Sequence, residues 1–453
     1  MSRTPVLVTR RTALKALSLG AASLLLPRKS QAQDKPAPDA LRLAFVGVGG
    51  QGFQAVRALG DQAHVAFADV DDLQAAEAYQ LRPDVPRYRD FREMLDRHAD
   101  QIDAVIISTP DHTHFPVAMA CMAAKKHVYI EKPLAPTPWE CRELQKAAKR
   151  HQVKAQLGIQ GHSASSLRML REWIDAGVAG KIEAVHMWTD RMQPYRHHWS
   201  ETLPAEEAKP DTLSWDLWLA GRPARPFSSH YVPNRWRNWW GFGTGPIGDI
   251  GVHMFDVAEF ALDLGFPEWV EAEVPAISAF TTPQWTKAQW HYAPRGRRGA
   301  IDVYWHNGAR DGKLVRPTEI PRLTPEVITN LTNAVVFVGT EGTLVVEDMR
   351  ATSRPRFYPQ EKERELLRHG PPRSLPRVAG NHYEDFFTAI RDDSQPGANL
   401  DYGAPLTEAV LLGTLAQRTG KRIRWDRDRM AVVGVPEAEP YLKPQISAGW
   451  IPG

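Results

Sequence analysis

Short apolar runs alternate with stretches of helical periodicity over the first third of the chain. Each run has the length of a buried strand, and the helical stretches between them are amphipathic or alanine-rich. The apolar runs are residues 41–46, 64–70, 103–108, 127–130 and 154–159, and two of the helical stretches are about residues 115–124 and 139–151. Strands that alternate with helices predict a parallel, doubly wound α/β sheet. Ligands of such sheets bind at the carboxyl ends of the strands.

A glycine-rich turn follows the first predicted strand. It reads Gly47-Val-Gly49-Gly50-Gln51-Gly52 and leads into an alanine-rich helical pattern. In this strand–turn–helix context, the first glycine makes the tight turn, the second lets a pyrophosphate approach the backbone, and the third lets helix and strand pack closely. The phosphates would then rest on the helix N-terminus. The turn therefore predicts a dinucleotide-binding Rossmann domain, which we place at residues 41–160.

An aspartate ends the second predicted strand. Asp69 lies about 20 residues after the glycines, where a carboxylate can accept hydrogen bonds from the ribose hydroxyls of the adenosine. Asp71 and Asp72 follow, and the sequence puts no Arg or Lys in place to meet a 2′-phosphate. These carboxylates favour NAD over NADP as the cofactor. A simple cap of the strand end is the structural alternative for Asp69.

Polar residues also follow the next two strands. Thr109, Pro110 and His114 belong to the phrase STPDHTH, and Glu131 and Lys132 come after the strand that contains HVYI. Because the carboxyl ends of parallel strands meet at one edge of the sheet, we assign these five residues to the cofactor site.

Residue types that bind metals or form disulfides are sparse. His112 and His114 form a His-x-His pair, but no third ligand follows at a spacing typical of metal sites. We therefore expect them to line the cofactor loop or to cap a helix. The chain has two cysteines, Cys121 and Cys141, and both fall in predicted helices beside strands. We interpret them as core thiols. The sequence predicts neither a metal site nor a disulfide framework.

The stretch GDIGVHMFD carries the best candidates for proton transfer. If it is helical, Asp249 and His253 lie four residues apart on the same side, and Asp256 shares that face. An imidazole titrates near working pH, so His253 is the candidate base. Asp249 could orient the ring or bind a substrate hydroxyl, and Asp256 could do either. The structural alternatives are a helix cap for Asp249 and a satisfied core histidine for His253.

Lys132 completes this group. An ammonium can donate a hydrogen bond to a reacting oxygen, and its charge lowers the pKa of a nearby histidine. Hydride transfer from a carbinol needs such a base, such a donor and a fixed distance to a nicotinamide. A surface ion pair with Glu131 is the alternative for Lys132.

Composition sets the class of protein. The chain has 453 residues, of which 43% are apolar and 24% charged, as in a soluble globular protein with two domains. A net charge of +3 without a basic run argues against a nucleic-acid partner. Seven of the 15 tryptophans fall between residues 188 and 240, which predicts either a bulky core or an aromatic wall for a sugar-like ligand. Arg191, Tyr195, Trp236 and Arg237 are the candidate substrate contacts there, with core or subunit interface as an equal alternative.

The N-terminus has the pattern of an export signal. Paired arginines precede an apolar run at residues 16–27, and a small-x-small site ends at Ala32. That run is too short to span a bilayer, which takes roughly 20 residues. The pattern resembles a twin-arginine signal, whose machinery exports proteins that have already folded in the cytoplasm. We therefore expect a signal peptide at residues 1–32, a linker at 33–40, a periplasmic or otherwise exported protein, and no stable membrane anchor.

The motifs together resemble the glucose–fructose oxidoreductase / inositol dehydrogenase (Gfo/Idh/MocA) family. The matching phrases are GVGGQG, the later Asp69, STPDHTH and KHVYIEKPL, and the resemblance extends from residue 41 to about 426. It implies an N-terminal Rossmann domain and a C-terminal α+β domain at 161–430 with a large, mostly antiparallel sheet. It also implies a cis peptide before Pro133 and homo-oligomers formed through that sheet. Residues 431–453 form a tail without a readable pattern.

The same resemblance assigns Lys132, Asp249 and His253 to the family's catalytic trio. Phrases such as LSWDLWLAGRPARPF resemble a branch of the family with twin-arginine signals, whose members are associated with sugars or sugar derivatives. The first hypothesis is therefore an exported, NAD-dependent oxidoreductase of a sugar, cyclitol or sugar derivative that holds its cofactor tightly.

A second hypothesis is a redox-neutral, NAD-dependent glycosidase. Such an enzyme oxidises a sugar hydroxyl transiently, eliminates the glycosidic bond, adds water and reduces the sugar again. The family contains such enzymes in glycoside hydrolase family 109, although their histidine motif differs from GDIGVHMFD. The chemistry needs one more proton acceptor, for which Tyr195, His197 or His198 could serve. A non-catalytic nucleotide sensor is the third class, and the intact trio argues against it.

Overall fold

The computed structural model describes residues 39–191, 199–296 and 298–451. The expected signal peptide and most of the expected linker lie outside the described residues, as do Tyr195, His197 and His198. In the part of the chain that is described, no helix is both long enough and apolar enough to cross a membrane.

The N-terminal sheet has six parallel strands in the order β3-β2-β1-β4-β5-β6. The strands are β1 (Arg42–Val46), β2 (Ala63–Ala68), β3 (Arg87–Tyr88), β4 (Ala104–Ile107), β5 (His127–Glu131) and β6 (Ala155–Gly158). The helices that connect them are α2 (Gln51–Ala58), α3 (Asp72–Leu81), α4 (Phe91–His98), α5 (Asp111–Ala123) and α6 (Pro138–His151). All four residues of β4 and β6 are buried, as expected for strands covered on both faces. The predicted doubly wound sheet is confirmed.

Helix α5 begins earlier than its sequence pattern indicates. We expected a helix from about residue 115, but α5 starts at Asp111, so most of TPDHTH forms the first turn of the helix. His112 and His114 are buried in that turn. The His112 ring packs 4.6 Å from the Trp218 ring and 5.0 Å from the Phe242 ring, centroid to centroid. Packing against these distant aromatic residues overrides the local polarity that suggested a loop.

The C-terminal domain is built on an eight-stranded sheet. Its order is β14-β13-β12-β7-β10-β9-β8 with β11 beside β10, and only the β7–β10 pair is parallel. The strands are β7 (Ile182–Thr189), β8 (Trp269–Glu273), β9 (Trp285–Tyr292), β10 (Ile301–Arg310), β11 (Lys313–Leu314), β12 (Asn333–Gly339), β13 (Thr343–Val346) and β14 (Arg356–Tyr358). The predicted large, mostly antiparallel sheet is confirmed.

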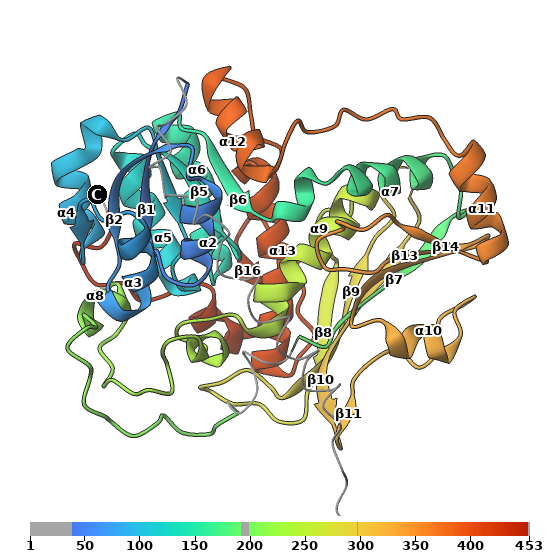
Figure 1. Cartoon of the computed structure of the whole chain (residues 1–453). Coiled ribbons are helices and arrows are strands. Elements are labelled where there is room, and N and C mark those ends of the chain that lie inside the picture. Colours follow the sequence, from blue (N-terminus) through green and yellow to red (C-terminus); the bar gives the residue numbers. More distant parts are fainter. Residues whose placement is uncertain (1–38, 192–198, 297, 452–453) are drawn as a thin grey trace, which may run out of the picture.

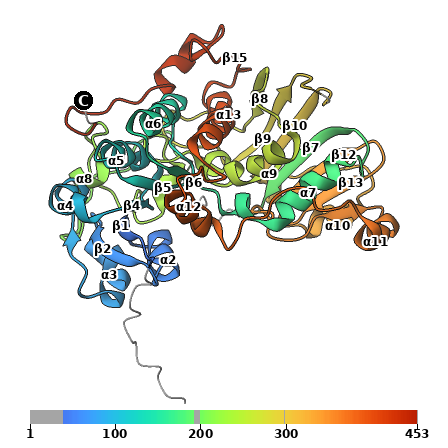
Figure 2. The same cartoon turned by 90° about the horizontal axis from the view of Figure 1, so that it is seen from above.

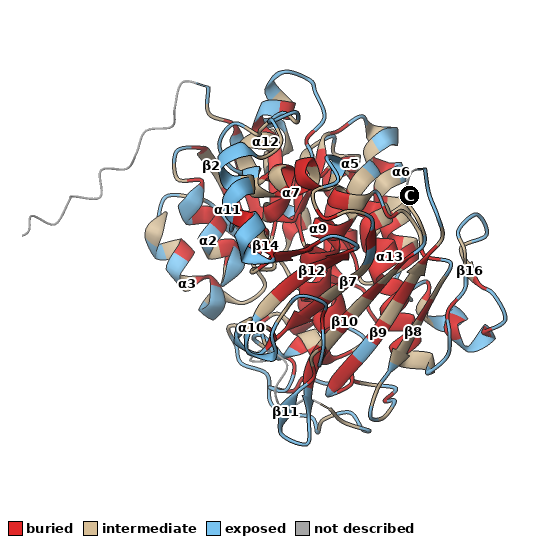
Figure 3. Ribbon diagram, turned by 90° about the vertical axis from the view of Figure 1, so that its right-hand side faces the viewer, coloured by how far each residue is buried: buried red, intermediate tan, exposed pale blue. Residues whose placement is uncertain are grey.

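One face of this sheet is covered by helices. α7 (Ser165–Asp175), α9 (Val252–Leu262) and α13 (Leu400–Thr419) lie on it, and α13 also packs on α6 of the N-terminal domain (Figures 1 and 2). Figure 3 looks onto the opposite face, where the short α10 (Pro325–Asn330) covers one part near β12. Helices α11 (Gln360–His369) and α12 (His382–Arg391) also belong to this half of the chain.

Two segments that follow the N-terminal sheet in the sequence reach back over the N-terminal domain (Figure 1). The first contains α8 (Trp215–Leu219), and its Ser214 N–H donates to the Val70 carbonyl at 2.8 Å. The second is the chain's C-terminal segment, with the hairpin β15 (Trp425–Asp426) and β16 (Ala431–Val432) and a 3₁₀ helix at Pro436–Tyr441. Both segments therefore help to enclose the carboxyl end of the parallel sheet.

The first of these segments is fixed by a buried ion pair. Arg222 Nη2 lies 2.6 Å from Glu140 Oε1 on α6, and the same nitrogen donates to the His112 carbonyl at 3.0 Å. The Arg222 side chain is 7% exposed and that of Glu140 is fully buried. A pair this dry holds the segment around α8 against α6, because separating the two residues would leave each buried charge without a counter-charge.

Candidate active site

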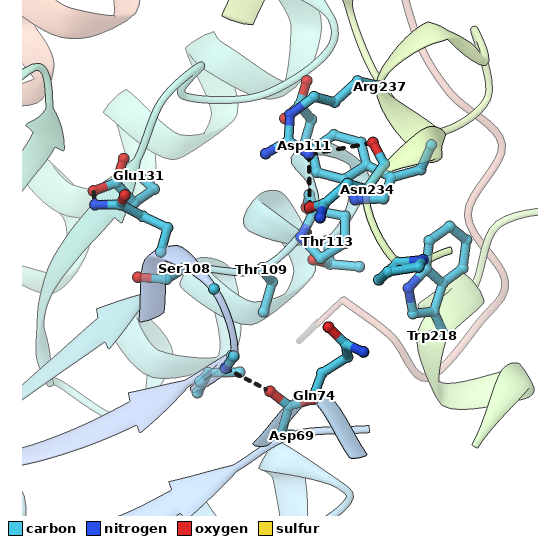
Figure 4. A pocket seen from close by; sticks show the side chains of 18 of the residues that line it. Asp69, Gln74, Ser108, Thr109, Asp111, Thr113, Glu131, Trp218, Asn234 and Arg237 are labelled. Carbon is cyan, nitrogen blue, oxygen red and sulfur yellow. Dashed lines mark hydrogen bonds between the residues drawn. The ribbon is translucent and has the colours of Figure 1, made fainter. Parts of the chain in front are cut away.

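A cavity of about 620 Å³ lies at the carboxyl ends of the parallel strands, between the two domains. Its walls come from the glycine-rich turn, from the ends of β2, β4 and β5, from the segment around α8, from α9 and from the C-terminal segment. Figure 4 shows Asp69 and Gln74 at one end, with Asp111, Asn234 and Arg237 at the other. The cavity therefore joins the predicted cofactor residues to the predicted catalytic residues in one space.

The glycine-rich turn has the shape that a dinucleotide requires. Gly47 has φ +79°, and a Cβ on Gly52 would lie 1.9 Å from the Gly47 carbonyl oxygen, so the third glycine lets the helix pack on the turn. Gly50 begins α2 without a side-chain cap, and nothing stands within 4 Å of where its Cβ would be. The backbone at Gly50 and Gln51 is thus accessible to a phosphate at the start of α2, whereas the Gly52 N–H donates to the Gly49 carbonyl at 2.9 Å. Gly47, Gly49, Gly50 and Gln51 line the cavity, whereas Gly52 is buried behind it.

Asp69 follows β2 and lines the cavity beside the glycine-rich turn. Its carboxylate accepts hydrogen bonds from the N–H groups of Val48 at 2.8 Å, Gly49 at 3.3 Å and Asp71 at 3.0 Å. Burial raises the pKa of Asp69 to about 6, although these hydrogen bonds oppose the rise. The carboxylate both fixes the glycine-rich turn and faces the cavity, so it is more than a cap of the strand end.

One expectation about this end of the cavity was wrong. The sequence suggested that no basic residue stands near Asp69, yet Arg89, which follows β3, lines the cavity. The fold brings β3 beside β2, which the sequence spacing does not reveal. The Arg89 guanidinium is paired with Asp72, with Nε 3.1 Å from Oδ2.

The TPDHTH segment contributes Thr109 and Pro110 to the cavity wall, but His114 does not line it. The ring nitrogens of His114 lie 2.8 Å from the Pro133 carbonyl oxygen and 2.9 Å from that of Thr109. Burial lowers the pKa of His114 to about 4, so the ring is neutral. His114 therefore supports the two loops that form the wall, instead of touching a cofactor as predicted.

Lys132 and Asp249 meet across the domain boundary. Lys132 follows β5, and its peptide bond to Pro133 is cis, as the family resemblance implied. Its ammonium forms an ion pair with Asp249 Oδ1, and Arg237 Nε lies 3.2 Å from Asp249 Oδ2. Glu131 is not the partner of the ammonium, because its carboxylate accepts from Gln160 at 2.9 Å and from Gln51 at 3.3 Å.

The segment GDIGVHMFD folds as a π-helical turn, Ile247–Gly251, followed by α9. This turn presents Asp249, and His253 stands in the first turn of α9; both line the cavity. Irregular turns of this kind are common at functional sites. Burial lowers the pKa of His253 well below its usual value, and the positive charges of Lys132 and Arg350 lower it further. The imidazole is therefore neutral near pH 7 and able to accept a proton.

Asp256 does not belong to this group. Its carboxylate lies 2.8 Å from His162 Nδ1 and accepts a hydrogen bond from the Tyr402 hydroxyl at 2.6 Å. The side chain is 1% exposed and is absent from the cavity wall. Asp256 therefore does not line the cavity with His253, because His162 from the turn before α7 and Tyr402 from α13 hold its carboxylate.

The aromatic residues divide between core and cavity. A compact cluster buries Trp215, Tyr231, Trp239 and Phe242, as the bulky-core interpretation expected. Trp218 and Trp236 belong to the same cluster and also line the cavity, together with Arg191 and Arg237. Tyr195, the remaining predicted substrate contact, lies outside the described residues. Both cysteines are buried and unpaired, as expected.

Several further residues of the wall were missed by the sequence reasoning, among them Asp111, Arg350 and Trp450. Asp111 is 2% exposed and accepts a hydrogen bond from Thr244 Oγ1 at 2.8 Å; burial and the nearby Asp249 charge raise its pKa to about 7. Its place after the strand β4 could have identified it. Arg350 and Trp450 come from loops far along the chain, and no local pattern marks either one. Among the described residues, no group of three or more His, Cys, Asp and Glu side chains could hold a metal ion.

Two sequence patterns of one protein family match the chain. The pattern described as "oxidoreductase family, NAD-binding Rossmann fold" matches residues 41–159. The pattern described as "oxidoreductase family, C-terminal alpha/beta domain" matches residues 164–300.

Curated relatives match the chain in part. The rhizopine catabolism protein MocA of Rhizobium meliloti is 30% identical over 165 residues, which are 36% of this chain and 49% of that protein. The α-N-acetylgalactosaminidase of Shewanella oneidensis is 30% identical over 193 residues, which are 39% of this chain and 41% of that protein. The chain thus spans half or less of the length of these relatives.

Solved structures match over most of the chain. The WlbA dehydrogenase of Bordetella pertussis, in complex with NADH and UDP-GlcNAcA, has a TM-score of 0.58 at 18% identity and covers 85% of this chain and 98% of that one. The inositol dehydrogenase homologue of Azotobacter vinelandii, in complex with NADH and myo-inositol, has a TM-score of 0.55 at 17% identity and covers 87% and 100%. At such identities the likeness establishes the fold.

Proposed function

Because this chain belongs to the Gfo/Idh/MocA oxidoreductase family, we propose that it is an NAD-dependent oxidoreductase acting on a hydroxyl group of a sugar, cyclitol or sugar derivative. One observation carries the proposal. The cavity that begins at the glycine-rich turn ends at Lys132, Asp249 and His253, so a dinucleotide in the first part would place its reactive end beside proton-handling groups. Relatives whose structures contain NADH with a sugar nucleotide or an inositol support the substrate class.

The proposed chemistry divides the work among three side chains. Neutral His253 accepts the proton of the substrate hydroxyl as the carbon–hydrogen bond breaks. Lys132 donates a hydrogen bond to the same oxygen and stabilises the charge that develops there. Asp249 holds the ammonium in place through their ion pair and keeps its orientation fixed. A bound nicotinamide would supply the acceptor for the hydride.

We favour NAD over NADP from the charges around the ribose site. Asp69 and Asp71 line the cavity where a 2′-phosphate would lie, and like charges repel it. The nearby guanidinium of Arg89 is already paired with Asp72. A purified protein that binds NADPH at least as tightly as NADH would contradict this preference.

Export by the twin-arginine route stays part of the proposal, supported by the arginine pair and apolar run of residues 10–27. We also propose a homo-oligomer formed through the outer face of the large sheet (Figure 3). Half-buried planar side chains stack there, with Trp269 and His291 centroids 5.1 Å apart and Tyr304 and His186 centroids 4.9 Å apart. A monomer by light scattering at micromolar concentration would contradict the oligomer.

A redox-neutral glycosidase is the second candidate. Its support is the similarity to the α-N-acetylgalactosaminidase and a cavity wall that offers an additional acid. Elimination needs a second group that takes up and returns a proton. Burial raises the pKa of Asp111 to about 7, so its carboxyl group can gain or lose a proton near neutral pH.

One experiment tests both candidates. The purified protein is denatured, the released nucleotide is identified, and the intact holoenzyme is offered free sugars, keto-sugars and aryl glycosides. We expect bound NAD and reduction of the bound cofactor, read at 340 nm, by at least one free sugar or cyclitol. Cleavage of an aryl glycoside without net NADH would favour the glycosidase. A protein that neither retains nor binds NAD would exclude both.

A further inference from the structure

The chain's last described residues cross the N-terminal domain beside α4, as Figure 1 shows. We call residues 442–451 the C-terminal strap. Its beginning is attached to α6: the Leu442 carbonyl accepts from the Trp139 N–H at 3.4 Å, and the Lys443 ammonium lies 4.5 Å from the centre of the Trp139 ring. Its end is attached to the segment after α8, where the Ser447 N–H donates to the Gly221 carbonyl at 2.8 Å. The strap is therefore held at two points, one on α6 and one on the turn after α8.

The strap ends on a tryptophan that forms part of the cavity wall. The Trp450 ring lies 6.3 Å from the Phe91 ring, centroid to centroid, and the Arg92 guanidinium lies 4.2 Å from its centre. Arg92 is itself fixed by Asp90, with Nη2 2.6 Å from Oδ2. Two neighbours thus set the position of a ring that is only half-buried and that faces the cavity.

Gly221 makes this position possible. A Cβ on Gly221 would lie 2.6 Å from two atoms of the Trp450 ring, which is closer than such atoms approach. The glycine has φ +77°, so the turn after α8 brings its backbone directly against the ring. The indole is therefore packed between the turn of Gly221 and the start of α4.

The position of the ring along the cavity indicates what it would contact. Phe91 and Arg89 follow β3, which lies beyond β2 and Asp69 at the edge of the parallel sheet. In a Rossmann domain the carboxylate at the end of the second strand meets the ribose of the adenosine, so the adenine lies further toward that edge. Trp450 is therefore at the adenosine end, away from Lys132 and His253.

We propose that Trp450 and the C-terminal strap close the adenosine end of the cavity and slow the release of the dinucleotide. The inference rests on the proposed function because it requires a dinucleotide in this cavity. An adenine ring can stack on the face of an indole. Stacking of a base on an aromatic side chain is strong and does not depend on which base is bound, because every base has a π-face. The strap would give an exported enzyme, which meets little free cofactor, a means of keeping the one it carries.

The decisive variants change the ring directly and through its neighbour. Trp450→Ala removes the platform, and Trp450→Phe keeps a smaller one. Gly221→Ala displaces the indole through the added Cβ and leaves Trp450 itself unchanged. Gly177→Ala is its matched control, since Gly177 has φ +70° and nothing within 4 Å of its Cβ position. Each variant is prepared as the full chain and checked for an unchanged thermal transition of the nucleotide-free protein.

The readout is the rate at which bound NADH leaves each variant when excess NAD⁺ is added, followed by NADH fluorescence. We expect Trp450→Ala to release NADH about tenfold faster than the wild type, Gly221→Ala to behave similarly, and Trp450→Phe to lie in between. Gly177→Ala should match the wild type, and the Gly221→Ala/Trp450→Ala double variant should release no faster than Trp450→Ala. AMP affinity should fall with Trp450→Ala, whereas nicotinamide mononucleotide affinity should not.

The outcomes separate the two claims. If the wild type does not bind NADH, the proposed function fails, and the role of the strap fails with it. If the wild type holds NADH but Trp450→Ala and Gly221→Ala release it at the wild-type rate, only the role of the strap is overturned. Equal effects of Gly221→Ala and Gly177→Ala would also overturn it, because the effect would then belong to backbone strain.

Discussion

Asp111 offers a test of the electrostatics of the cavity that does not depend on a substrate. Its carboxyl group is buried at the start of α5, receives one hydrogen bond from Thr244 and lies near the charge of Asp249. The change Asp111→Asn keeps the shape and an acceptor oxygen for the Thr244 hydroxyl but removes the ability to ionise. Any change in stability should then come from the charge.

The size and sign of the effect follow from the pKa. Burial raises the pKa of Asp111 from 3.8 to about 7, and three units at 1.36 kcal/mol each amount to about 4 kcal/mol. The protonated carboxyl is favoured in the folded state. Its contribution to stability is therefore fully present below pH 4 and is lost as the pH rises to 7. The asparagine variant loses nothing over this range, so it should be more stable than the wild type at pH 8 by about 4 kcal/mol.

Thermal unfolding with saturating NAD measures this difference. At pH 8 we expect Asp111→Asn to melt about 5 °C above the wild type, and at pH 5 the difference should shrink to about 2 °C. Asp61→Asn, at an exposed site, should change neither value. If Asp111→Asn melts below the wild type at pH 8, or if its advantage does not depend on pH, then the carboxyl is not held in its neutral form and the reasoning is refuted.

Three other predictions concern catalysis and domain attachment. Lys132→Ala and His253→Ala should each lower turnover by at least about a hundredfold while the protein still purifies with bound NAD; a near-normal rate in either would refute the site. Because burial and Lys132 lower the pKa of His253, kcat/KM should decline only well below pH 6.5, and a midpoint at or above 6.5 would contradict a neutral base. Glu140→Gln should lower the free energy of unfolding by about 3–5 kcal/mol, and adding Arg222→Met should restore most of it; additive losses would show that the pair is not coupled.

The sequence predicted the strands and the glycine-rich turn of the N-terminal domain well, because local patterns of residues define both. The apolar runs ended within two residues of the strand ends, and the glycine-rich turn, Asp69 and Lys132 all follow strands whose register brings them to one edge of the sheet. The mostly antiparallel second sheet was implied by the family resemblance alone. No periodicity in the second half of the chain would have given its strand order, because β7 pairs with strands far along the sequence.

The misses have a common physical cause. Asp256 was expected to act beside His253 because of the helical spacing, but His162 and Tyr402 hold its carboxylate outside the cavity. His114 was assigned to the cofactor, yet two carbonyl groups surround its ring. In each case a partner distant in the sequence decides where the side chain points. Trp450 was missed for the same reason, since only the folded chain brings residue 450 to the adenosine end.

The central claim is hydride transfer within this cavity, and isotope transfer tests it most directly. A free sugar or cyclitol that reduces the bound cofactor is prepared with deuterium at its ring carbons and incubated with the holoenzyme in the absence of any acceptor, and the dinucleotide released by denaturation is examined by mass spectrometry. We predict that deuterium appears in the dinucleotide from the wild type and is absent when His253→Ala is used. Turnover of the labelled substrate without deuterium in the dinucleotide would contradict the account.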